Sequence, residues 1–177
     1  MTSTVRVAVD AMGGDRGPDE IVAGALEAAS GSIQPILYGP AGLDTNGLEL
    51  VEAADTIGMH EKPVEAVRAK PDSSLVVACR AVGDGHADAI VSAGNTGAML
   101  AASLFYVRRL TEVDRPAIAV VIPTRDGPSV LLDSGANADA RLNRRHRPRT
   151  PCRVRDPAPS GWGAALPATR PSACAAD

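Results

Sequence analysis

The chain of 177 residues has few aromatic side chains: one Trp, two Tyr and one Phe. Proteins that bind single-stranded nucleic acid stack the bases on aromatic side chains, so this class of binder is not expected. The formal net charge is −3, which also argues against a basic surface for nucleic acid. The composition therefore predicts no nucleic-acid partner.

Long apolar runs are lacking as well. No stretch approaches the roughly 18 apolar residues that a membrane span needs. The first residues enter a strand-like pattern at once, without the apolar stretch of a secretory signal peptide. We therefore expect a cytoplasmic protein.

Cysteine is scarce and odd in number, with Cys79, Cys152 and Cys174. This number and spacing fit neither a disulfide framework nor a zinc site, so no metal is predicted. Cys79 lies in the apolar segment SSLVVACRAV. We expect it to be buried and inert rather than a nucleophile, because neither His60 nor His86 has a spacing that would activate it.

The charge changes sign partway along the chain. Residues 1–139 carry 10 Lys and Arg against 19 Asp and Glu, whereas residues 140–177 carry 8 Arg and 2 Asp. The second part has six Pro and no Ile, so no strand or amphipathic helix is expected there. It is interpreted either as a basic disordered tail that contacts anionic partners or as the product of a reading-frame shift in a GC-rich gene. The abrupt break in pattern favours the frame shift.

Strand-like and helix-like segments alternate through residues 1–139. Strands are expected at 5–10, 33–39, 48–53, 87–92, 116–124 and 128–133. Helices are expected at 18–29, from Pro63 to Pro71, from Asp72 or Ser73 to about Val82, and at 96–109. This alternation predicts an α/β fold with a largely parallel sheet.

Three turns that contain glycine follow predicted strands, and loops at the carboxyl ends of parallel strands line the ligand crevice of such folds. Glycine lets backbone N–H groups approach an anion, and the start of a helix favours negative charge. The turns therefore predict a phosphate or acyl-phosphate site, to which Ser92, Asn95 and Thr96 add side-chain donors. Alternatively, the glycines serve tight turns and the polar residues cap helices. The turn residues are Gly13, Gly14 and Asp15; Gly94, Asn95, Thr96 and Gly97; and Gly135 and Asn137.

Three aspartates lie at or just beyond strand ends: Asp10, Asp15 and Asp133. Each is a candidate for orienting a cation, binding a metal or acting as a base, although such residues more often cap a loop or pair with Arg. His60 and His86 lie in polar segments and are expected to be solvated. Neither a P-loop nor a GxGxxG motif is present, so nucleotide binding is not indicated.

Five segments in the same order resemble the bacterial phosphate acyltransferase family. They are VDAMGGDRGP (9–18), IGMHEKPVEAVRAKPDSSL (57–75), DAIVSAGNTGAML (88–100), DRPAIAVVIPTRDG (114–127) and VLLDSGANAD (130–139). The resemblance implies a three-layer fold like that of the isocitrate and isopropylmalate dehydrogenases, residues 1–139 forming the N-terminal part of the domain. It implies reversible transfer of a fatty acyl group from acyl carrier protein to inorganic phosphate, in a homodimer without an organic cofactor. The acyl phosphate would pass to a membrane-bound glycerol-3-phosphate acyltransferase, which implies a cytoplasmic enzyme with peripheral membrane association.

The resemblance also implies roles for the turns. Ser92, Asn95 and Thr96 are the catalytic candidates. The candidates for phosphate and acyl binding are Asp10, Gly13, Gly14, Asp15, Gly94, Gly97, Asp133, Gly135 and Asn137. Bound phosphate would attack the thioester directly, without a covalent acyl-enzyme.

Two departures from the family leave alternatives open. The connection at 39–47 is shorter than the helix-bearing connection usual in the family, and family members are roughly twice as long. The chain is therefore interpreted as an acyltransferase or as a truncated, inactive fragment that at most binds phosphate. A third interpretation, a short-chain phosphate acetyl- or butyryltransferase that uses coenzyme A thioesters, fits the five segments least well.

Overall fold

The computed structural model describes residues 4–110, 118–124 and 127–132. The chain divides into two compact units, Met1–Arg115 and Pro116–Asp177, which are considered separately. The predicted tail at 140–177 lies outside the described residues, as does the end of the predicted first domain at residue 139.

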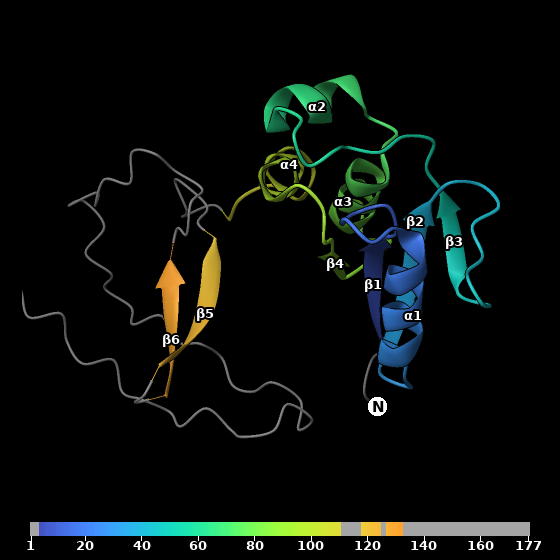
Figure 1. Ribbon diagram of the computed structural model, residues 1–177, viewed down its shortest axis with the longest axis horizontal. Helices are drawn as coiled ribbons and strands as arrows, with labels where there is room; N and C mark the ends of the chain where they lie inside the picture. The colour runs from blue at the N-terminus through green and yellow to red at the C-terminus, as the bar shows by residue number, and fades with distance from the viewer. Residues whose placement is uncertain (1–3, 111–117, 125–126, 133–177) are drawn as a thin grey trace, which may run out of the picture. The chain divides into compact units, whose positions relative to one another are not determined.

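The first unit is built on a parallel sheet of four strands with the order β3-β2-β1-β4 (Figure 1). The parallel sheet predicted from the alternation of strands and helices is thus confirmed in this unit. β4 is shorter at both ends than the strand expected at 87–92, and before it the N–H of Ala87 donates to the carbonyl of Ala81. The strands are β1 (Val5–Asp10), β2 (Ile33–Gly39), β3 (Glu49–Glu52) and β4 (Ala89–Val91).

Helices start where the sequence places proline or a polar residue. Pro18 begins α1 and Pro63 begins α2, since a missing N–H costs nothing in the first turn. Ser73 precedes α3, but its hydroxyl donates to the carbonyl of Lys70 at 2.9 Å and does not cap the helix. The helices are α1 (Pro18–Ala28), α2 (Pro63–Ala69), α3 (Ser74–Gly83) and α4 (Thr96–Ala102).

The predicted continuous helix at 96–109 is wrong in its second half. The α-helical hydrogen bonds of α4 end at Ala102, and the chain continues as a π-helix, η1 (Ser103–Val107). Arg108 then takes a left-handed φ of 70°, which ends the helix. In an apolar run such as this one, the spacing of the residues indicates neither the change to a π-helix nor the position at which the helix ends.

Helices cover both faces of the sheet. α1 packs with Val9 and Leu37 on one face, and α3 packs with Ala8 and Ile36 on the other. Side chains of neighbouring positions in a strand point to opposite faces, so β1 and β2 contribute to two cores. The predicted three-layer α/β class is confirmed.

The connection from β2 to β3 contains no helix. Parallel strands usually need a crossover of a dozen or more residues, but here residues 40–48 suffice. Leu43 and Leu48 from this connection pack against the core beneath α1 and occupy part of the space beside it. The short connection expected from the sequence is confirmed.

In the second unit, β5 (Ala119–Thr124) pairs with β6 (Gly127–Leu132) in an antiparallel ladder. The two strands were expected, and their pairing with each other gives this unit a sheet of its own.

Candidate functional site

Two of the three glycine turns meet at the carboxyl edge of the sheet. They follow β1 and β4, which are adjacent and parallel, so their ends lie side by side. The approach is close: a Cβ added to Gly13 would lie 2.6 Å from Oδ2 of Asp10 and 2.8 Å from the backbone N of Gly94. Only glycine fits at position 13.

The carboxylate of Asp10 joins the two turns. This residue is 3% exposed. It accepts hydrogen bonds from the hydroxyls of Ser74 at 2.5 Å and Ser92 at 2.7 Å. The oxygen of Ser92 in turn accepts from the backbone N–H of Gly94 at 3.0 Å. A relay of hydrogen bonds therefore runs from the second turn to the end of β1.

Sequence reasoning missed Ser74. It is 1% exposed on the first turn of α3, and its hydroxyl donates to Oδ1 of Asp10 at the end of β1. The available signal was the pair Ser73-Ser74 directly before an apolar helix face, because a buried hydroxyl must find a partner.

The side chain of Asn95 has four hydrogen-bonding partners, and the two hydrogens of its Nδ2 are shared among three of them. Oδ1 accepts from the N–H of Ala98 and caps α4. Nδ2 lies 3.2 Å, 3.3 Å and 3.1 Å from the carbonyl oxygens of Gly58, Met59 and Glu61. The side chain, predicted to be catalytic, is thus fully engaged in holding the segment before α2 against the start of α4.

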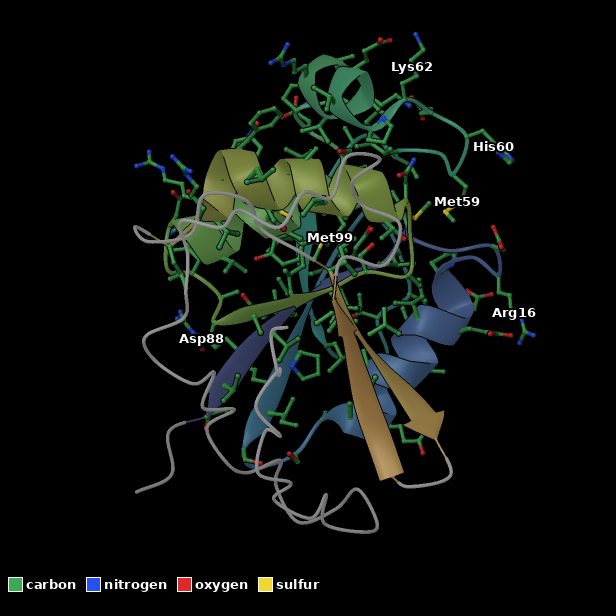
Figure 2. All side chains as sticks on the ribbon, turned by 90° about the vertical axis from the view of Figure 1, so that its left-hand side faces the viewer. Arg16, Met59, His60, Lys62, Asp88 and Met99 are labelled. Atoms are coloured by element: carbon green, nitrogen blue, oxygen red, sulfur yellow. The ribbon has the colours of Figure 1, made fainter. Side chains whose placement is uncertain are left out.

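A second polar cluster fixes the same segment. Nζ of Lys70 donates to the Glu61 carboxylate and to the carbonyl of Thr56, both at 2.8 Å. Hydrogen bonds from Lys70 and from the N–H of Gly58 lower the pKa of the Glu61 carboxyl. Figure 2 shows Met59 and His60 on this segment, and exposure of His60 agrees with the expectation that it is solvated.

Thr96 and Gly97 open α4 beside the second turn. Thr96 is exposed, whereas a Cβ on Gly97 would lie 2.5 Å from Cγ of Pro63. Gly97 therefore lets α4 start against α2. Gly14 has a φ of +107°, which favours glycine, and Asp15 follows it on the surface.

Some backbone donors of these turns are uncommitted. The N–H groups of Gly14, Thr96 and Gly97 make no hydrogen bond within the parts of the chain described by the structure. Such groups at a glycine turn or a helix start are suited to an anion. Asp133, Gly135 and Asn137, from the third predicted turn, lie outside the described residues.

Cys79 is buried, as predicted. Burial raises the pKa of its thiol to about 11, so the thiolate is scarce at neutral pH. His86 is exposed and therefore also agrees with the prediction of a solvated histidine. Cys152 and Cys174 lie outside the described residues. Within residues 4–110 and the two described strands of the second unit, no helix has the length and apolar character of a membrane span.

Comparison with known proteins gives a consistent answer. A family described as "Fatty acid synthesis protein" matches residues 5–144. A phosphate acyltransferase of Heliobacterium modesticaldum is 46% identical over 149 residues, which are 77% of this chain and 44% of that protein. One from Desulfitobacterium hafniense is 49% identical over 147 residues, with the same coverage. The chain thus spans less than half the length of these relatives.

Among solved structures, a match is found with a branched-chain phosphotransacylase from Enterococcus faecalis V583. The TM-score is 0.49 and the sequence identity 18%, over 76% of this chain and 44% of that chain.

Proposed function

Because the chain belongs to the fatty acid synthesis protein family, we propose that it acts in reversible transfer of a fatty acyl group from acyl carrier protein to inorganic phosphate. Relatives named phosphate acyltransferase, at 46% and 49% identity, support this reaction. The observation that carries the proposal is the junction of the two glycine turns. Hydrogen bonds from Ser74 and Ser92 to Asp10 hold this junction together, and N–H groups beside it make no hydrogen bond within the described residues.

In the proposed reaction, an oxygen of bound phosphate attacks the carbonyl carbon of the acyl thioester. The new C–O bond forms, the C–S bond breaks, and the thiolate of the carrier leaves and takes up a proton. Backbone N–H groups of Gly14, Thr96 and Gly97 hold the phosphate or the oxyanion of the tetrahedral intermediate, because fixed donors need no reorganisation during reaction. Asn95 and Ser92 position the turns that carry these donors.

Direct attack by phosphate agrees with the absence of an activated thiol among the described residues. Cys79 is buried and its thiol has a raised pKa. The hydroxyl of Ser92 donates to Asp10 while its oxygen accepts from Gly94, so this side chain is committed to the junction. No covalent acyl-enzyme is required.

The family suggests the partners. We propose that acyl carrier protein delivers the acyl group, that the protein acts as a homodimer in the cytoplasm, and that it associates peripherally with the membrane. A membrane-bound glycerol-3-phosphate acyltransferase would consume the acyl phosphate. No organic cofactor is required by this reaction.

A second function is favoured by one observation, the 44% coverage of the first relatives. On this alternative, the chain binds phosphate at the junction and transfers no acyl group.

Trapping of acyl phosphate with hydroxylamine distinguishes the two functions. Purified chain is mixed with acyl-acyl carrier protein and phosphate, and acyl hydroxamate is measured against a control with carrier protein that lacks the acyl group. Phosphate-dependent hydroxamate supports the transferase. A thermal transition that rises with phosphate, without hydroxamate, supports a binding fragment. If neither hydroxamate nor a phosphate-dependent rise in the thermal transition is observed, both functions are contradicted.

A further inference from the structure

A hollow with a volume of about 300 Å³ lies on the α3 face of the sheet, where β2 and β3 pass the end of α3. Its floor is apolar and includes Val51 of β3 together with Val77 and Ala81 of α3. Two exposed carboxylates lie on its lining, those of Glu49 at the start of β3 and Asp84 directly after α3. The hollow thus combines apolar walls with a few polar groups, as sites for small molecules do.

Tyr38 of β2 gives this hollow a buried polar group without a partner. The residue lines the hollow, is 3% exposed, and packs its ring in the core under α3. A buried tyrosine hydroxyl usually finds a hydrogen-bond partner, but this one bonds to no residue that the structure describes. Within the same residues, no fully enclosed side-chain oxygen lacks a partner. The Tyr38 oxygen is therefore the accessible atom of this residue, and it faces the hollow.

The uncompensated charges around the hollow are negative. Glu49 and Asp84 form no ion pair or side-chain hydrogen bond in the described ranges. Arg80 also contributes to the lining, but its Nη2 donates to the carbonyl of Pro71 at 3.2 Å and its guanidinium carbon lies 5.2 Å from the Tyr106 ring centre. The C-terminal end of α3, which Asp84 follows, adds partial negative charge. The hollow therefore favours a cation.

The hydroxyl of Tyr38 is in the protonated form that such a ligand needs. Burial and the charge of Glu49 raise the pKa of Tyr38, whereas Arg6 lowers it by a smaller effect. The guanidinium of Arg6 is itself paired with Asp88 at 2.9 Å. A protonated hydroxyl can accept a hydrogen bond from a ligand while it donates its own hydrogen to a carboxylate.

We propose that the hollow binds a small organic amine, with its ammonium group directed to the Tyr38 hydroxyl and to the carboxylates of Glu49 and Asp84. An ammonium group has three hydrogens to donate, and the imidazole of His86 on the lining is a further acceptor. The apolar body of the amine would cover Val51 and its neighbours on the floor, and so leave water. An anion would meet two unpaired carboxylates and be repelled.

The position of the hollow makes this inference independent of the proposed acyl transfer. β3 begins and α3 ends beside it, which places it at the amino edge of the parallel sheet. The glycine turns lie at the opposite, carboxyl edge. The amine site and the phosphate site can therefore be tested separately.

Three probes with one aromatic body test the charge of the ligand. The wild-type chain is titrated by calorimetry with 2-phenylethylamine, 2-phenylethanol and phenylacetate. We expect the amine to bind, the alcohol to bind roughly tenfold more weakly, and phenylacetate not to bind. Absence of amine binding, or equal affinity for the amine and the alcohol, would overturn the inference.

Variants locate the amine in the hollow. Tyr38→Phe keeps the ring in the core and removes a hydroxyl without a partner, so the thermal midpoint should not change while amine affinity falls about fivefold. Glu49→Gln should weaken the amine roughly tenfold. Glu52→Gln is the matched control on the same strand, because Glu52 is exposed and does not line the hollow, and it should bind the amine as the wild type does.

Equal losses in Glu49→Gln and Glu52→Gln would show a general attraction of amines to the acidic surface and would contradict the site. Wild-type affinity of Tyr38→Phe would contradict it as well. Amide chemical shifts, followed by NMR during titration of the wild type, give the position without a variant. We expect changes at 49–51 and 84–87, and changes confined to other segments would exclude the hollow.

Discussion

Asp10 makes its contribution by holding two loops together. Its oxygens accept from hydroxyls on α3 and on the turn after β4, 64 and 82 positions away along the chain. Hydrogen bonds to an ionised group contribute about 1.5–3 kcal/mol each. The position of Asp10 at a strand end made it a candidate base, but its carboxylate is engaged in positioning the turns.

Gly13 is the position at which these turns tolerate no side chain. We expect Gly13→Ala to lower the free energy of unfolding by about 1–3 kcal/mol, as overpacking does, because the new Cβ would lie 2.8 Å from the backbone N of Gly94 and 2.9 Å from Oγ of Ser92. The phosphate-dependent rise in thermal midpoint should be lost as well. Urea denaturation and thermal melts with phosphate measure both effects.

Gly31→Ala is the control for this substitution. A Cβ at Gly31 meets nothing within 4 Å, so the variant should keep both its stability and its response to phosphate. Equal behaviour of the two variants would contradict the close approach of the turns.

Substitutions at Asn95 test whether this predicted catalytic residue acts by holding two segments of the fold together. Asn95→Ala leaves three carbonyl oxygens and the N–H of Ala98 without this partner. We expect unfolding free energy to fall by about 2–4 kcal/mol, measured by urea denaturation. Asn95→Asp should be worse, since a carboxylate would face those carbonyl oxygens. Thr96→Ala, at the exposed neighbouring position, should stay within about 0.5 kcal/mol of the wild type, and an equal loss there would contradict this role.

At the scale of elements, a bidentate ion pair lies beside the pairing of β1 with the three-residue β4. Nε of Arg6 donates to Oδ2 of Asp88 at 3.1 Å, and its Nη2 donates to Oδ1 at 2.9 Å. The backbone N–H of Arg6 also donates to Asp88. Figure 2 shows Asp88 where the chain enters β4. These bonds anchor the short strand at the end opposite the glycine turns.

The pair should make stability depend on acid pH. The hydrogen bond from Arg6 lowers the pKa of Asp88 from 3.8 to about 2, so its stabilising effect is present above pH 3.8 and is lost as pH falls towards 2. We expect the thermal midpoint of Asp88→Asn to lie below that of the wild type at neutral pH. The gap should narrow below about pH 4. Melts of both proteins across this range measure the gap, and a constant gap would contradict the assignment.

At the scale of the molecule, the sheet of the first unit ends on β3 and β4. In the described part of the chain, β4 pairs with β1 alone. An edge strand of this kind offers free N–H and C=O groups to other chains. The sequence, with its strands rich in aliphatic residues, therefore carries a risk of aggregation through this edge.

A lysine on the edge strand should reduce this risk. We expect Val91→Lys to slow aggregation on heating, measured by light scattering at matched protein concentration, because charged side chains block edge-to-edge pairing. Val5→Lys adds the same charge to β1, at a position that pairs with Ile33 of β2 and lies away from the β4 edge, and should protect less. Equal protection by both would show that net charge, and not the β4 edge, governs aggregation.

The sequence by itself determined the elements and the position of the glycine turns. Pro18 and Pro63 indicate where helices begin, and the β-branched run at 5–10 indicates a strand, because these preferences act over a few residues. The order of elements then predicted a parallel sheet with turns at its carboxyl edge. The π-helical end of α4 escaped prediction, since a run of apolar residues looks the same in either kind of helix.

Only the tertiary structure decided what the polar residues do. Asp10 meets Ser74, and Asn95 meets the segment before α2, across 64 and 34 to 37 positions of chain. Gly97 serves a contact with Pro63 that no local pattern shows. Hydrogen bonds and close approaches depend on which distant segments the fold brings together, whereas helix starts and turns depend on neighbours in the chain. The elements could therefore be read from the sequence, and the partners of the site residues could not.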